Sequence, residues 1–156
     1  MAGGVLGPGA MPFRVTFFDN SPDSNWLVAW PQHTALPLVD RREAPGWGPW
    51  AHSPAAALQQ VLTLRVQPDH STAAHGPLRV LFCTHELRVL TDEEIRQRAG
   101  ESQRIARTVA AGGVVRMRPL LLHASSKSLS DQPRRVVHIE YAASLGIGDG
   151  LELAVV

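Results

Sequence analysis

Hydrophobic and polar positions alternate in several short segments of the chain, which is the pattern of half-buried β-strands. Residues 61–67 show it most clearly, with Leu62 and Leu64 on one face and Thr63 and Arg65 on the other. Similar segments, separated by turn-forming residues, occur at residues 13–18, 26–30, 77–82 and 105–109. With the strands expected near the C-terminus this makes about seven, a succession that predicts a sandwich or barrel.

Signals for helix are few. Thr91 is followed three positions later by Glu94, a capping box that predicts a helix beginning at Asp92 and ending by Gly100. Residues 54–60 can form one helical turn, and residues 1–11, rich in Gly, Pro and Ala, are expected to be a loose lead-in. The sequence therefore predicts a mainly β fold with one or two short helices, in a single domain over residues 1–156.

Residues 31–56 contain five prolines and predict a long irregular loop. All four tryptophans fall between residues 26 and 50. They can form a packed cluster that stabilises this loop, or an aromatic wall over a pocket. The first interpretation is favoured because tryptophan is usually retained for the apolar area it buries.

Composition excludes several classes of protein. Of the 156 residues, 44% are hydrophobic and 19% charged, which is ordinary for a globular domain, and the net charge is +1 without any basic run. Neither nucleic acid nor a membrane surface is therefore indicated as a partner. Cys83 is the only cysteine, and the sequence has no signal peptide and no transmembrane stretch, so a cytoplasmic location is expected.

Residues 112–143 predict a strand, a polar loop and a second strand. His123 lies where the first strand ends and Arg134 where the second begins, so a hairpin would bring them together. Pro119 interrupts the first strand, which favours an edge position or a bulge. In the second strand, odd positions such as Val137 are apolar and even positions such as His138 are mostly polar. The polar face can line a wet pocket or face solvent, and periodicity alone favours solvent.

Several of these segments, in order, resemble the phytanoyl-CoA dioxygenase family of Fe(II)- and 2-oxoglutarate-dependent oxygenases. Residues 117–126, Met-Arg-Pro-Leu-Leu-Leu-His-Ala-Ser-Ser, and the strand from Arg134 are similar to the distal motif of that family. Residues 17–19 and 25–30 look like the lead into its iron site, and residues 76–81 like its mid-chain strand. The resemblance implies a double-stranded β-helix, the cupin-like jelly roll. It also implies Fe(II) on two histidines and a carboxylate.

Carried over by position, the resemblance makes His123 the late iron ligand and Arg134 the residue that pairs with the far carboxylate of 2-oxoglutarate. The early His-x-Asp pair is altered: Pro31 stands in place of the histidine and His33 in place of the carboxylate, so His33 is the second candidate metal ligand. The resemblance begins near residue 5, whereas members of the family usually carry a further N-terminal helical part, so a shortened chain is expected.

Two functions are implied. One is an oxygenase that hydroxylates a small organic substrate with Fe(II) and 2-oxoglutarate, impaired because two of three iron ligands are replaced. The other is a non-catalytic relative that keeps the fold as a small-acid binding or interaction module. A third possibility is a decayed or partial copy of poor stability. The remaining histidines lie in loops or at strand ends and show no ligand spacing; they are His52, His70, His75 and His85. The closeness of Cys83 and His85 in sequence is too weak a signal to predict a catalytic nucleophile.

Overall fold

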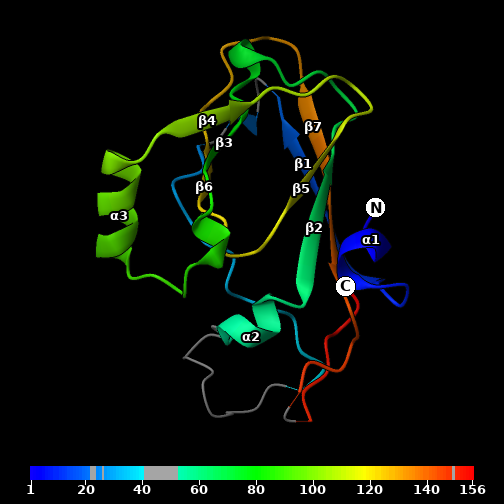
Figure 1. Ribbon diagram of the computed structural model, residues 1–156. Coiled ribbons are helices and arrows are strands. Elements are labelled where there is room, and N and C mark those ends of the chain that lie inside the picture. The colour runs from blue at the N-terminus through cyan, green and yellow to red at the C-terminus, as the bar shows by residue number, and fades with distance from the viewer. Residues whose placement is uncertain (22–23, 26, 41–52, 149) are drawn as a thin grey trace.

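The computed structural model describes residues 1–21, 24–25, 27–40, 53–148 and 150–156. Two antiparallel sheets face each other (Figure 1). The larger sheet has the order β1 (Met11–Asn20), β7 (Arg134–Ala142), β2 (Val61–Val66), β5 (Val114–Met117). The smaller sheet has the order β4 (Arg104–Arg107), β3 (Leu78–Leu81), β6 (His123–Ser125). This architecture confirms the mainly β double-stranded β-helix expected from the sequence.

The helices are short and lie outside the sandwich. They are α1 (Gly3–Leu6), α2 (Ala55–Leu58) and α3 (Asp92–Glu101), with 3₁₀ turns η2 (Ala73–His75) and η3 (Thr84–Glu86). The capping box predicted at Thr91 is present, and α3 ends one residue beyond the predicted limit, on the outer side of the smaller sheet (Figure 1). Over the described residues, no helix is both long and apolar enough to cross a bilayer.

The N-terminal segment is not a loose lead-in. Residues 3–6 form α1, and Ala2 and Leu6 pack against Leu62 and Leu64 on the outer face of β2. The C-terminus is tied to the same sheet, since the Val156 N–H donates to the Phe13 carbonyl at 2.7 Å. Leu62 and Leu64 make the outer face of β2 apolar, as the sequence pattern indicates, and α1 buries these side chains.

Of the strand predicted at residues 26–30, the described residues 27–30 form a single bridge, between Val28 and Ser125. Trp26, Trp47, Trp50 and His52 lie outside the described residues. Trp30 packs against the buried cluster of Leu81, Leu90, Ala99 and Leu122. The guanidinium carbons of Arg79 and Arg104 lie 5.6 and 5.8 Å from its ring centroid. Trp30 also lines an open cavity of about 710 Å³, so both interpretations apply to this residue.

The predicted hairpin between His123 and Arg134 is wrong. β6 pairs with β3 in the smaller sheet, whereas β7 pairs with β1 and β2 in the larger one. Pro119 lies in the connection by which the chain leaves β5 after Met117 and enters β6 at His123. Both are edge strands, β5 of the larger sheet and β6 of the smaller one, so the edge position expected there agrees with the structure. A residue without an N–H cannot continue a ladder, so the strand ends there. His123 and Arg134 therefore approach each other across the sandwich.

Apolar packing fills one end of the sandwich. The largest cluster joins Phe13, Leu58, Val61 and Ala142, the last of these at the end of β7. From Ala142 back toward Arg134, the inner face of β7 becomes polar, and this part of the interior contains the candidate site.

Candidate functional site

The inner face of β7 consists of the even-numbered residues. Arg134, His138 and Glu140 expose only 4%, 2% and 2% of their surface, whereas the neighbouring Arg135 points outward and pairs with Asp69 at 2.7 Å. The solvent-facing interpretation of this polar face is therefore wrong. Because strand residues alternate between faces, a polar row on the inner face places charged groups inside the protein.

The strands on both sides of β7 add further polar groups to this interior. Arg65 of β2 lies opposite His138, and its Nη1 is 3.3 Å from Nδ1 of that ring. Arg14 of β1 lies opposite Glu140 and forms an ion pair with it. A guanidinium can only donate, so Nδ1 of a neutral His138 accepts and its proton resides on Nε2.

His123 and His33 form the opposite wall. The rings lie 4.7 Å apart between centroids at an interplanar angle of 84°. Nδ1 of His123 is 2.8 Å from the carbonyl of Leu121. Because a carbonyl only accepts, Nδ1 carries the proton, and Nε2 is left with a lone pair available to a metal.

The segment before His33 is fixed by its neighbour Gln32. The Gln32 side chain donates to the carbonyl of Leu120 at 3.1 Å and accepts from the Leu90 N–H at 2.8 Å. The His33 N–H donates to the Pro119 carbonyl at 2.8 Å. The same connection that delivers His123 to the smaller sheet thus holds His33 beside it.

His33, His123 and Arg134, the three site residues predicted from the sequence, line one cavity of about 130 Å³. Their roles as metal ligands and acid anchor stay predictions. The other described residues that line it are Phe18, Asn20, Val28, Arg65, Leu78, Ala124 and Ser125. With the Asn20 amide turned so that its oxygen faces Arg134, that oxygen accepts from Nη2 of Arg134 at 2.9 Å.

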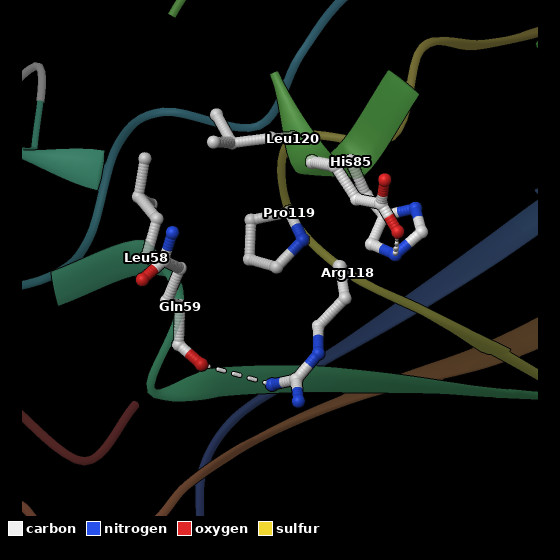
Figure 2. A pocket seen from close by; sticks show the side chains of 7 residues that line it. Leu58, Gln59, His85, Arg118, Pro119 and Leu120 are labelled. Atoms are coloured by element: carbon white, nitrogen blue, oxygen red, sulfur yellow. Dashed lines mark hydrogen bonds and ion pairs between the residues drawn. The ribbon is translucent and has the colours of Figure 1, made fainter. Parts of the chain in front are cut away.

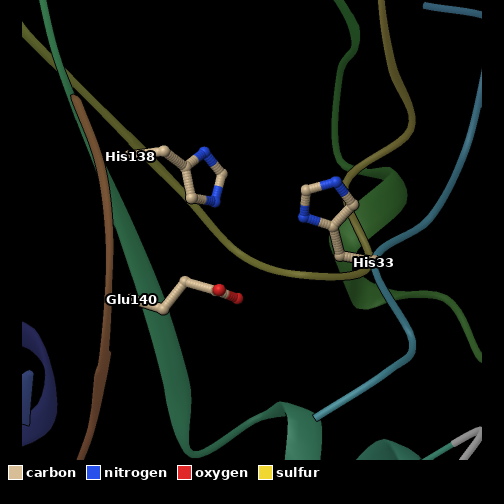
Figure 3. A group of neighbouring side chains, drawn as sticks. All are labelled: His33, His138 and Glu140. Carbon is tan, nitrogen blue, oxygen red and sulfur yellow. The ribbon is translucent and has the colours of Figure 1, made fainter. Parts of the chain in front are cut away.

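A second group of possible ligands was missed from the sequence. His138 and Glu140 point from β7 toward His33, and the ligand atoms of the three residues lie within 4.8 Å of one another (Figure 3). The alternation of polar residues in the second predicted strand was the signal that could have found them. It could not show which face is inside.

Burial keeps all three imidazoles neutral. Desolvation is the largest cause in each case, and it lowers the pKa of His33 to about 4, of His123 to about 3 and of His138 to about 2. The positive charge of the Arg65 guanidinium is a smaller contribution to each of these lowered pKa values. At neutral pH all three rings are therefore in the neutral form that metals bind, but the Nδ1 lone pair of His138 already accepts from Arg65.

The imidazoles of this interior fit a divalent metal held through nitrogen, and the group whose ligand atoms lie within 4.8 Å of one another is His33, His138 and Glu140. His33 and His123 stay the ligands predicted from the sequence. It does not reproduce a facial triad, because Pro31 has no donor and the nearest carboxylate, Glu140, is engaged by Arg14. The buried guanidiniums of Arg65 and Arg134 also oppose a cation. This balance of charge disfavours a tightly held cation.

A larger cavity, of about 430 Å³, is lined by Arg118, Pro119 and Leu120 together with Leu58, Gln59, His85 and Glu86 (Figure 2). Its Arg118 donates to the carbonyls of Gln59 and Val61 at 2.9 and 3.0 Å, so this charge serves the backbone. His85, at its rim, lies 3.9 Å from Glu86. Among the described residues this cavity brings together no second ligand group comparable to that around His33.

Solved structures share this fold. EvdMO1 is 25% identical, with a TM-score of 0.67, and the match covers 90% of this chain and 29% of EvdMO1. The non-heme alpha ketoglutarate dependent epimerase SnoN, from nogalamycin biosynthesis, is 18% identical, with a TM-score of 0.69 and coverages of 90% and 50%. EctD from S. alaskensis, solved with 2-oxoglutarate and 5-hydroxyectoine, is also 18% identical, with a TM-score of 0.66 and coverages of 90% and 47%.

The chain thus spans half or less of the length of each of these three proteins. No curated protein matches it in sequence. The model of the family Phytanoyl-CoA dioxygenase (PhyH) matches residues 31–136, which is most of the chain and includes His33, His123 and Arg134. The resemblance seen in the motifs is therefore confirmed, and the chain belongs to the phytanoyl-CoA dioxygenase family.

Proposed function

We propose that this chain is a weakly metal-binding oxygenase of the Fe(II)- and 2-oxoglutarate-dependent type, acting on a small organic substrate. Arg134 anchors the far carboxylate of 2-oxoglutarate, and His123 and His33 hold the metal. The observation that carries the proposal is that these three residues, from three separate segments, line one cavity. SnoN is described as alpha ketoglutarate dependent and EctD was solved with 2-oxoglutarate, which supports the same cosubstrate here. A cytoplasmic location belongs to this proposal.

Each residue has a separate task. The planar guanidinium of Arg134 offers two parallel N–H donors to a carboxylate, and Asn20 holds it in place from β1. Phe18 and Val28 line the cavity beside it and reduce its contact with water, which strengthens the charge pair. When bound, Fe(II) supplies the oxygen chemistry that side chains lack.

A second candidate function is a non-catalytic small-acid binding module. It is favoured by the charge of the site: Pro31 supplies no metal ligand, and Glu140 is paired with Arg14. The anion-binding half of the site needs neither residue. Both candidates use Arg134 to bind the acid. They differ in whether a bound metal then supports turnover or the acid is only bound.

Anaerobic titration with Fe(II), with and without 2-oxoglutarate, tests the proposal through the metal-to-ligand charge-transfer absorption. We expect a weak band that requires both components and is lost in His123→Ala, with slow succinate release on admitting oxygen. Exposed His70 provides the matched control, His70→Ala, which should retain the band. Absence of the band and of succinate at saturating Fe(II) would reject the oxygenase in favour of the acid-binding module.

A further inference from the structure

Arg65 is a buried charge without a carboxylate partner among the described residues. It exposes 8% of its surface, its Nε has no hydrogen-bond partner, and its Nη1 faces the neutral His138 ring. The ring of Phe18 lies 5.6 Å from its guanidinium carbon, a weak compensation. Taking a guanidinium out of water without an anion is costly, so such a group calls for a ligand.

Arg134 is in the same condition. It exposes 4% of its surface, and its Nε is also without a partner. Both arginines line the 130 Å³ cavity, and the described residues of that lining include no Asp or Glu. Burial lowers the pKa of Arg65 to about 10, with Arg134 as a second cause, so the two charges sense each other and both persist at neutral pH.

The backbones of the two arginines lie at different levels along β7. Arg65 pairs in register with His138, and Arg134 lies four residues earlier on the same strand. At about 3.3 Å per residue the two levels are roughly 13 Å apart along β7. Both long side chains nevertheless line the same cavity, so two guanidiniums from backbone positions well separated along the strand serve one space.

We propose that Arg65 is a second carboxylate anchor and that, with Arg134, it clamps both ends of a short dicarboxylate without any metal. This rests on the proposed function, because it takes the same cavity as the acid site. It goes further because the second carboxylate of the ligand binds the Arg65 side chain and not a metal. A dianion neutralises the two guanidiniums, whereas a monocarboxylate leaves one of them unpaired.

The size of the cavity narrows the class of ligand. Pockets for drug-sized ligands measure about 300–1,000 Å³, so this cavity suits an acid of a few carbon atoms. Ser125 and Asn20 add polar groups to the lining, and Leu78 and Val28 add apolar ones. An unbranched dicarboxylic acid with a short methylene chain matches that mixture.

The experiment is calorimetric titration of the whole chain in EDTA with glutarate, 2-oxoglutarate and pentanoate, the last having the same carbon count as glutarate but one carboxylate. Arg65→Gln should weaken glutarate binding by about thirtyfold or more, the effect of losing one buried charge partner, and change pentanoate binding little. Arg134→Gln should weaken both acids. Arg116→Gln, an exposed arginine on the neighbouring strand β5, is the control and should behave like the unmodified chain.

Thermal unfolding shows whether a loss of binding in a variant is caused by a loss of folding. Because it removes an unpaired buried charge, Arg65→Gln should leave the ligand-free protein as stable as before or more stable, while the rise in Tm with glutarate shrinks. Equal glutarate affinity in Arg65→Gln and the unmodified chain, or glutarate binding abolished by EDTA, would overturn the clamp. So would inorganic phosphate binding as tightly as glutarate. Metal-free glutarate binding without any succinate release in the Fe(II) assay would leave the clamp standing and reject only the oxygenase.

Discussion

His33 and His123 lie with their rings 4.7 Å apart although one belongs to an irregular segment and the other opens β6. Both depend on one connection between the sheets. The His33 N–H donates to the carbonyl of Pro119, and His123 donates to that of Leu121. Hydrogen bonds to two backbone carbonyls of one short segment thus hold both histidines in place. The close approach of the rings does not need a metal.

Gln32 should be the residue on which this pairing depends. Gln32→Ala removes its bonds to the Leu120 carbonyl and the Leu90 N–H, and a buried donor left unsatisfied costs about 1–3 kcal/mol. Urea unfolding should show a loss of that size, and the nuclear Overhauser contacts between the His33 and His123 rings should weaken. Gln59→Ala, at an exposed position, should change neither. Unchanged ring contacts in Gln32→Ala would mean that the backbone alone holds His33.

Restoring the His-x-Asp pair should strengthen metal binding. The double change Pro31→His with His33→Asp returns an imidazole and a carboxylate to the segment facing His123. Tighter Fe(II) binding and faster succinate release are expected, because a carboxylate offsets the charge of the metal. The change also frees φ at residue 31, so part of the gain is lost in ordering the segment. If Fe(II) affinity does not rise in anaerobic titration, the segment does not present its ligands to His123.

Acid should destabilise the metal-free protein before its carboxylates titrate. His33, His123 and His138 have folded pKa values lowered to about 4, 3 and 2 from the ordinary 6.5. Between about pH 6.5 and 4 the unfolded chain therefore binds more protons, so stability is full above that window and falls as pH drops through it. Urea midpoints in EDTA should decrease from pH 7.5 to 5. His123→Asn should flatten this slope and His70→Asn should not; a flat profile for the unmodified chain would contradict the burial of the rings.

Replacing Gly76 by a residue with a side chain should destabilise the fold, because the backbone there is left-handed and closely packed. Its φ is +60°, and a Cβ there would lie 2.2 Å from the carbonyl oxygen of Ser126, next to the strand that carries His123. Gly76→Ala should destabilise the fold by about 1–3 kcal/mol or more, the range for strained backbone. Gly100→Ala, in α3 with no atom within 4 Å of its Cβ, should stabilise by up to about 1 kcal/mol. Equal melting temperatures for the two variants would refute the close approach.

The sequence predicted the local elements better than their partners. The alternation in residues 61–67 and the capping box at Thr91 both identify elements that the structure has. Such signals depend on neighbours along the chain, which the sequence contains. The partners of β6 and β7 are strands far away in the sequence, β3 for β6 and β1 and β2 for β7. The hairpin predicted between β6 and β7 was therefore wrong.

The inner face of β7 shows the same limit at the site. Alternation separates His138 and Glu140 from Val137, but it cannot decide which set is inside, and polarity alone suggested the opposite. The partners Arg14 and Arg65 come from β1 and β2, far away in sequence, so the charge balance of the cavity was not predictable. His123 and Arg134 were identifiable as candidates because a family motif carries information that composition and periodicity lack.

Binding of 2-oxoglutarate to Arg134→Gln and Arg135→Gln, measured by calorimetry against the unmodified chain, tests the central claim most directly. The two arginines are adjacent on β7 but face opposite sides, one into the cavity and one toward Asp69. The account predicts that Arg134→Gln weakens binding by about 2–5 kcal/mol, the cost of losing a buried charge partner, and that Arg135→Gln leaves it nearly unchanged. Equal losses in both variants, or none in Arg134→Gln, would contradict an acid site on the inner face of β7.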